Sequence, residues 1–214
     1  MVASLAGLVV ACGAGFVVEW QMAARAGGGG GLRASFGEVT TRQLTRACPH
    51  SRRASWFLAV GYALAIGGAI AGRLIAPVFA LPGPVGAWVA AGFSVAILAT
   101  ALRGWSILVL GRLFDRDALL HADHVLVRSG PYRFVRHPAY TANLAFAIAT
   151  GIILANWASL LVATLLVLIA HAPRIRFEEA LLKQRFPTDY RTYTHQTGGL
   201  LPRPPRHDRR ALPR

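Results

Sequence analysis

The sequence predicts an all-α integral membrane protein, a helical bundle of about five transmembrane helices with its amino terminus outside and its carboxyl terminus in the cytoplasm. Of the 214 residues, 54% are hydrophobic and only 15% are charged, whereas soluble domains carry about a quarter charged residues. The mean hydropathy is +0.45. The apolar residues are gathered into blocks as long as membrane-spanning helices, which soluble core helices rarely match.

The apolar blocks define five segments, at Val2–Val18, Ala54–Ala71, Val85–Leu102, Tyr140–Ala155 and Trp157–Ala172. A cleaved signal peptide is the alternative for the first segment. No charged side chain precedes Glu19, so a transmembrane helix is favoured. Only Asn156 separates the last two segments, which predicts a tight hairpin that returns the chain to the neighbourhood of Tyr140.

The distribution of basic residues predicts the topology. Of the 23 Lys and Arg residues, 22 lie in residues 20–54, 103–139 and 173–214, and the turn at 73–84 holds only Arg73. Five spans place these three stretches on one side, which the positive-inside rule makes cytoplasmic. Nucleic-acid binding is the alternative for a net charge of +14. In a membrane protein such arginines instead reflect the orientation of the chain in the membrane and contact anionic lipids. We therefore expect a bilayer partner and no nucleic acid.

The same pattern predicts a domain organisation. Residues 1–102 would form three transmembrane helices with a basic cytoplasmic loop, residues 103–202 a catalytic region with a transmembrane hairpin, and residues 203–214 a disordered basic tail. The two cysteines, Cys12 and Cys48, have neither CxxC nor Cys/His spacing, which predicts free thiols and no metal site.

Two polar clusters flank the predicted hairpin, at Arg128–Tyr140 and Arg174–Glu179. Proline is favoured in the first helical turn, so a helix is predicted to start at Pro138 with His137 near its positive dipole end. An ordinary interfacial histidine is the alternative reading of His137.

The adjacent acids Glu178 and Glu179 project about 100° apart on a helix. We therefore expect one to face the bundle and the other to pair with Arg174 or Lys183. A carboxylate at this surface suits a cationic ligand, and a surface salt-bridge cluster is the alternative. Arginines beside the turn, such as Arg136, can bind carboxylates or serve as topology charges. The four tyrosines near this surface fit either a ligand site or an interfacial aromatic belt: Tyr132, Tyr140, Tyr190 and Tyr193.

The order of these motifs resembles the isoprenylcysteine carboxyl methyltransferase family. The resemblance covers roughly residues 100–202 and rests on Gly130–Tyr140, the apolar hairpin, Arg174–Glu179, Phe186, Tyr190, Tyr193 and Leu201-Pro202, with Leu102–Arg112 upstream. Residues 1–99 contribute only helices. The chain departs from the family at Ala142, where glycine is usual, and at Pro187, where the family has glycine after the phenylalanine.

The resemblance implies a membrane-embedded enzyme that transfers a methyl group from S-adenosylmethionine to a lipidic or prenylated substrate, most often to a carboxylate. It implies Arg136, Arg174 and Glu178 as candidate catalytic residues. The candidate cofactor-binding residues are Gly130, Tyr132, His137, Tyr140, Glu178 and Glu179. Because a carboxylate is already ionised at neutral pH, positioning would carry most of the catalysis, whereas an amine acceptor would need His137 or a glutamate as proton acceptor.

Two other functions fit the same scaffold. Sterol reductases that use NADPH resemble this family around the His-Pro turn, and a non-catalytic membrane protein would bind neither cofactor. For an enzyme, whether methyltransferase or reductase, the expected location is a bacterial inner membrane. The site is expected to face the cytoplasm, where charged cofactors are available.

Overall fold

The computed structural model describes residues 64, 66–113 and 125–203, and these residues are helical, with no strand. The predicted segment Val2–Val18, most of Ala54–Ala71 and the tail beyond Arg203 lie outside the described residues. The elements are a helix at Ile66–Ile75, η1 (Pro77–Phe79), α3 (Val85–Leu110), η2 (Gly111–Leu113), η3 (Gly130–Arg133), α4 (Pro138–Ile153), α5 (Trp157–Arg185) and α6 (Pro187–Gln196).

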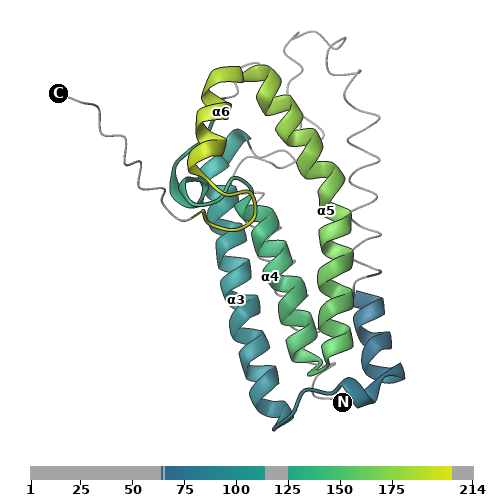
Figure 1. The fold of residues 1–214 in the computed structure, drawn as a ribbon. Coiled ribbons are helices and arrows are strands. Elements are labelled where there is room, and N and C mark those ends of the chain that lie inside the picture. Colours follow the sequence, from purple (N-terminus) through teal and green to yellow (C-terminus); the bar gives the residue numbers. More distant parts are fainter. Residues whose placement is uncertain (1–63, 65, 114–124, 204–214) are drawn as a thin grey trace, which may run out of the picture.

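Helix α4 packs between α3 and α5, and the helix at Ile66–Ile75 lies beside the first part of α5 (Figure 1). The interface is built from small side chains, including the buried Ala96, Ala149 and Ala163. Small residues let helix backbones approach closely where lipid removes the usual hydrophobic drive for helix association. The outward faces of α3 and α5 expose Leu98 and Ile169, which suits a lipid environment.

Two glycines mark the closest helix contacts. A Cβ on Gly92 of α3 would lie 2.5 Å from Ile153 Cγ1 and 2.9 Å from its backbone nitrogen. A Cβ on Gly151 of α4 would lie 2.6 Å from the Cβ of Leu160 in α5. Both interfaces of α4 therefore depend on a residue without a side chain.

The predicted hairpin between the last two segments is confirmed. Helix α4 ends at Ile153, Ala155 adopts a φ of 48°, and Asn156 caps α5 by accepting a hydrogen bond from the Ser159 nitrogen at 3.0 Å. The Asn156 Nδ2 also donates to the Ala76 carbonyl at 3.0 Å. One side chain thus closes the turn and ties it to the end of the preceding helix.

The helix ends differ from those predicted. Helix α3 continues to Leu110 rather than ending at Leu102, and α5 continues to Arg185 rather than ending at Ala172. The sequence prediction stopped at the first charged or helix-breaking residues, Arg103 and Pro173. Within the fold, Arg103 has acceptors on α4, and α5 continues through Pro173.

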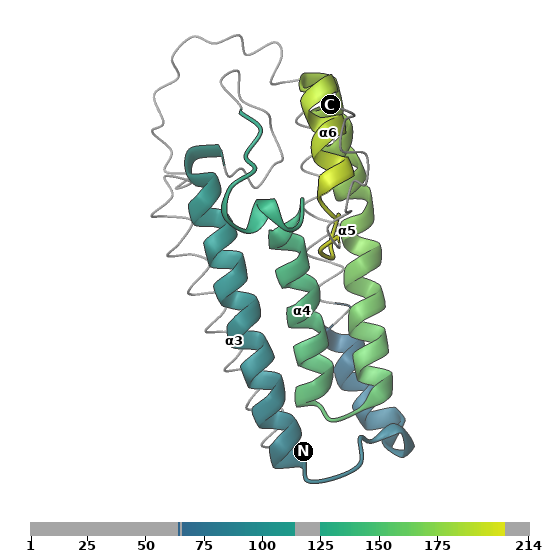
Figure 2. The ribbon, with the colours of Figure 1, turned by 60° about the vertical axis from the view of Figure 1, so that its left-hand side comes forward.

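Helices α3 and α5 are long and apolar enough to cross a bilayer, whereas α4 and the helix at Ile66–Ile75 are shorter apolar helices. At 1.5 Å per residue, α3 spans about 39 Å and α5 about 44 Å. The short polar helix α6 lies at the end of the bundle where α4 begins (Figure 2). Pro187 occupies its first turn, so the departure from the family's glycine gives α6 a favoured start.

Replacing Gly92 with alanine should loosen the contact between α3 and α4, because the new methyl group has to displace Ile153. We expect G92A to lower the free energy of unfolding by about 1–3 kcal/mol. Gly86 lies in the same helix, and a Cβ placed there would have nothing within 4 Å, so G86A is the control and should be neutral or slightly stabilising. Thermal unfolding in detergent measures both, and equal melting temperatures would contradict the assigned packing.

Candidate active site

His137 and Pro138 begin α4 as predicted. His137 is the N-cap residue, Pro138 occupies the first turn, and the His137 carbonyl accepts the Thr141 nitrogen at 2.9 Å. The His137 side chain is only 5% exposed. Its ring is therefore held inside the protein, at the positive end of the α4 dipole.

Glu178 joins the end of α5 to the first turn of α4. Its Oε1 accepts a hydrogen bond from the Tyr140 hydroxyl and another from Arg174 Nε at 3.1 Å. Arg174 Nε also donates to the Tyr140 hydroxyl oxygen at 2.7 Å. The three side chains form a closed triangle in which the phenol both accepts and donates.

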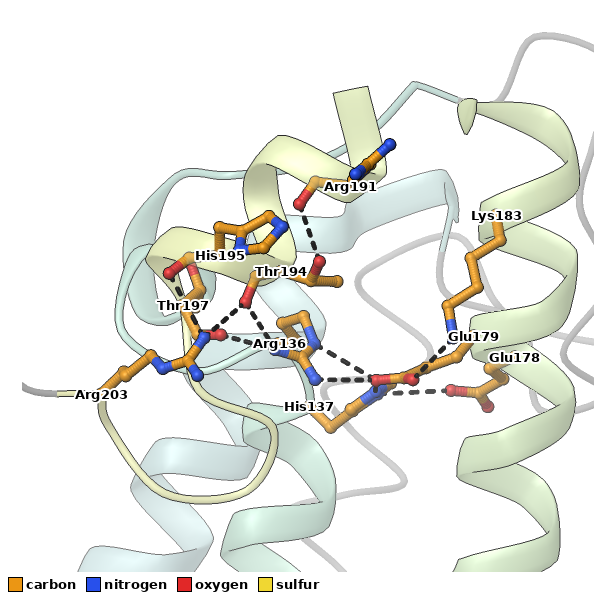
Figure 3. Close-up of polar contacts among 10 residues, drawn as sticks. All are labelled: Arg136, His137, Glu178, Glu179, Lys183, Arg191, Thr194, His195, Thr197 and Arg203. Atoms are coloured by element: carbon orange, nitrogen blue, oxygen red, sulfur yellow. Dashed lines mark hydrogen bonds and ion pairs between the residues drawn. The ribbon is translucent and has the colours of Figure 1, made fainter. Parts of the chain in front are cut away.

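Glu179 binds the residues that precede α4 (Figure 3). Its Oε1 accepts from Arg136 Nε at 3.2 Å, from Arg136 Nη2 at 3.0 Å and from His137 Nε2 at 3.3 Å. Its Oε2 lies 3.6 Å from Lys183 Nζ. Because a carboxylate only accepts, the His137 proton that faces it sits on Nε2.

The arrangement of the two glutamates therefore differs from the expectation that only one of them would face the bundle. Both face the turn at His137, with Glu178 pairing to Arg174 and Glu179 to Lys183 at helical spacing. Their side chains remain about one-fifth exposed, at 22% and 19%. We call this group, Arg136, His137, Tyr140, Arg174, Glu178 and Glu179, the His-Glu cluster.

A segment after α6 lies along the same turn. The Arg136 nitrogen donates to the Gly198 carbonyl at 2.8 Å, and the Thr141 hydroxyl donates to the Leu200 carbonyl at 2.7 Å. Arg136 Nη1 reaches the Thr197 carbonyl at 2.5 Å (Figure 3). Arg136 thus has acceptors for Nε, Nη1 and Nη2, and it binds the end of α5 and this segment together.

The tyrosines of α6 and η3 are buried, which favours the site over an aromatic belt. The Tyr193 hydroxyl donates to the Tyr132 carbonyl at 2.5 Å, and Tyr190 is 0% exposed. Burial raises the pKa of Tyr193 to about 12, so its phenol stays protonated and keeps donating. Gly130 adopts a φ of +57° and packs on Val109 of α3.

The structure thus brings together six of the eight predicted site residues in the His-Glu cluster. Gly130 and Tyr132 lie in η3, which packs on α3; Gly130 permits a tight turn there, and the Tyr132 hydroxyl reaches the Ser106 carbonyl at 3.5 Å. Among the described residues, no group of three His, Cys, Asp or Glu side chains could hold a metal ion.

The sequence reading missed a polar chain that crosses the bundle next to the cluster. Arg103 Nη1 donates to Asn143 Oδ1 at 2.9 Å, Asn143 Nδ2 donates to His171 Nε2 at 3.0 Å, and His171 Nδ1 donates to the Val167 carbonyl at 2.8 Å. The His171 ring contacts Tyr140 edge-on at 4.9 Å. Polar residues inside apolar segments are a recognised sign of function, and that sign was present at Asn143 and His171.

Comparisons with known proteins show what this region is similar to. Residues 90–184 match the model of the isoprenylcysteine carboxyl methyltransferase (ICMT) family. This region contains the whole His-Glu cluster, whereas Tyr190, Tyr193 and the segment after α6 lie beyond the match.

Individual relatives are similar to this chain over about half to two thirds of its length. A probable protein-S-isoprenylcysteine O-methyltransferase of Oryza sativa subsp. indica is 31% identical over 52% of this chain and 59% of its own length. The cobalt-zinc-cadmium resistance protein CzcN of Cupriavidus metallidurans is 30% identical over 55% of this chain and 53% of its own. A solved structure of the eukaryotic intramembrane Ras methyltransferase ICMT has a TM-score of 0.55 and 31% identity, and covers 66% of this chain and 52% of that one. The chain thus spans between half and three-fifths of these relatives.

Replacing Asn143 with leucine should destabilise the bundle, because it leaves Arg103 and His171 without their shared amide. We expect a loss of about 1–3 kcal/mol in the free energy of unfolding. The control is Thr150→Val in the same helix, since within the part of the chain that the structure describes the Thr150 hydroxyl bonds its own helix alone, at the Phe146 carbonyl. In a double-mutant cycle, N143L combined with His171→Leu should cost less than the sum of the single changes. Additive costs would refute the interhelical chain.

Proposed function

We propose that this chain is an S-adenosylmethionine-dependent membrane methyltransferase whose acceptor is a carboxylate on a lipidic or prenylated substrate. The observation that carries the proposal is the meeting of Glu178 and Glu179 with His137 and Arg136 at the start of α4. The match of residues 90–184 to the ICMT family model and the methyltransferase names of relatives support it.

The donor set fits S-adenosylmethionine. That cofactor carries a sulfonium, an ammonium and a carboxylate, and the cluster offers two partly exposed glutamates beside two arginines. Glutamates offset positive charge, and arginines bind carboxylates. We infer that the cofactor contacts His137, Tyr140, Glu178 and Glu179. Gly130 and Tyr132 would support the turn from η3.

The chemistry requires little of the protein beyond positioning. Bound S-adenosylmethionine would supply a methyl group that its sulfonium already activates. A carboxylate acceptor is ionised at neutral pH, so the cluster needs no general base. The residues of this chain supply charged groups in a fixed arrangement. The hydrogen bonds among Tyr140, Arg174 and Glu178 fix three polar groups at one point next to the apolar part of the bundle.

The two arginines take different roles in this proposal. Arg136 uses Nε, Nη1 and Nη2 on Glu179 and backbone carbonyls, so it acts by positioning. Arg174 lies deeper, on the bundle side of Glu178, with 10% of its side chain exposed. We therefore assign the substrate carboxylate to Arg174.

The topology also belongs to the proposal. We infer five spans in a bacterial inner membrane, with the amino terminus outside and the His-Glu cluster facing the cytoplasm. The supporting observations are the 22 of 23 basic residues in alternate stretches and the two long apolar helices. The division into residues 1–102, a catalytic region at 103–202 and a tail at 203–214 follows from the same pattern.

Removing the charge of either glutamate should weaken cofactor binding. We expect Glu178→Gln, Glu179→Gln and His137→Ala each to lower the affinity for S-adenosylmethionine at least about tenfold, since each removes a group at the positively charged ligand. Calorimetry on purified protein in detergent measures the affinity. Asp189→Asn is the matched control, because Asp189 is a surface carboxylate paired with Arg128 outside the cluster.

Unchanged affinity in all three variants would contradict the site. Binding of NADPH in place of S-adenosylmethionine by the unaltered protein would contradict the function and favour a reductase. Transfer of labelled methyl groups from S-adenosylmethionine to prenylated peptides and membrane lipids, followed by identification of the product, tests the acceptor.

The topology predicts opposite labelling of two surface positions. In a background with Cys12 and Cys48 replaced by serine, a cysteine at Val78 in η1 should react with a membrane-impermeant thiol reagent in intact cells. Val78 is 84% exposed, and the segment that contains η1 lies at the end of the bundle opposite α6 (Figure 1). A cysteine at Arg191 in α6 should react only after the cells are opened. The reverse pattern would invert the proposed orientation.

A further inference from the structure

Tyr190 lies on the face of α6 that covers the His-Glu cluster. The residue is 0% exposed, and its ring meets Tyr193 edge-on with 6.1 Å between centroids. Thr194 follows one turn later on the same face, and its carbonyl accepts Arg136 Nη1 at 3.5 Å. Tyr190 therefore packs toward the cluster rather than toward solvent.

The Tyr190 hydroxyl has no hydrogen-bond partner among the described residues. Buried polar groups are nearly always paired, and an unpaired one costs stability that a protein retains for a reason. The neighbouring Tyr193 shows the ordinary arrangement, since its hydroxyl donates to the Tyr132 carbonyl at 2.5 Å. Two tyrosines three residues apart thus differ in one respect. The Tyr193 hydroxyl is bonded to the backbone, whereas the Tyr190 hydroxyl lies beside Glu179 and Arg136 without a hydrogen bond of ordinary geometry.

Two charged groups of the cluster, Glu179 and Arg136, lie near this hydroxyl. Burial raises the pKa of Tyr190 above its ordinary value, the charge and hydrogen-bonding capacity of Glu179 raise it further, and Arg136 opposes the rise. The phenol therefore stays protonated and offers a donor beside the Arg136–Glu179 pair.

We propose that Tyr190 is a ligand-contacting residue of this site, whose hydroxyl donates a hydrogen bond to an acceptor atom of bound S-adenosylmethionine. The inference rests on the proposed function and names a contact outside residues 90–184, which match the family model. The polar cofactor is the occupant rather than the lipid, because α6 carries no exposed apolar side chain except Pro187 at its start, and its outward residues include Arg191, Thr192 and His195.

Tyr190→Phe and Tyr193→Phe form a matched pair that tests the inference. Because the Tyr190 hydroxyl has no partner among the described residues, Y190F should leave the melting temperature without ligand unchanged or slightly higher. Its affinity for S-adenosylmethionine and for S-adenosylhomocysteine should fall about tenfold, as expected for one lost hydrogen bond in a buried site. Y193F should lower the melting temperature, because it leaves the Tyr132 carbonyl without its donor.

Calorimetry and thermal unfolding of the full chain in detergent separate the outcomes. Unchanged cofactor affinity in Y190F, with the unaltered protein binding normally, would overturn this inference and leave the proposed function standing. A melting temperature of Y190F lowered as far as that of Y193F would also overturn it, by showing that the hydroxyl serves the fold. Failure of the unaltered protein to bind S-adenosylmethionine would overturn the proposed function and this inference with it.

Discussion

The ion pair between Arg136 and Glu179 holds the functional end of this protein together. Arg136 belongs to the turn before α4, Glu179 to the end of α5, and the carbonyls of Thr194 and Thr197 to α6 and the segment that follows it. Both ionic side chains are less than one-fifth exposed. A pair this deep stabilises little by attraction alone, because both charges lose water. Its value lies in geometry, since a planar guanidinium with several fixed acceptors admits few arrangements.

That geometry depends on the apolar bundle beneath it. At the glycine contacts, α4 packs closely against α3 and α5 because no side chain separates the helices. At the far end, the Asn156 cap fixes the turn of the hairpin. With both ends of α4 held, the start of α4 and the end of α5 must meet. The polar chain from Arg103 through Asn143 to His171 adds directional hydrogen bonds between the helices, which apolar packing lacks. Arg103 can only donate, so it sets the direction of the Asn143 amide and hence the His171 tautomer.

The sequence predicted the parts of this arrangement that depend on local patterns. Two apolar blocks separated by Asn156 located the hairpin, and proline chemistry located the start of α4 at Pro138. The motif order identified the six residues that meet in the His-Glu cluster. The helix ends at Leu110 and Arg185 were missed, because Arg103 and Pro173 break a hydropathy pattern without breaking a helix whose charges find partners across the bundle. The contrast between Tyr190 and Tyr193 could not be read from sequence at all, since it depends on which phenol meets a backbone carbonyl from a distant segment.

The partners of the cluster explain how such a site can hold a charged ligand without collapsing in its absence. Arg136 forms an ion pair with Glu179, and Arg174 forms one with Glu178. None of these four side chains is therefore an unpaired buried charge in the absence of ligand. A zwitterionic ligand can share these pairs, because its positive groups approach the outer carboxylate oxygens and its carboxylate approaches a guanidinium. S-adenosylmethionine brings one net positive charge, and the two glutamates offset it. Recognition then combines this charge with hydrogen bonds, and a buried donor such as the Tyr190 hydroxyl adds discrimination that another cation would not.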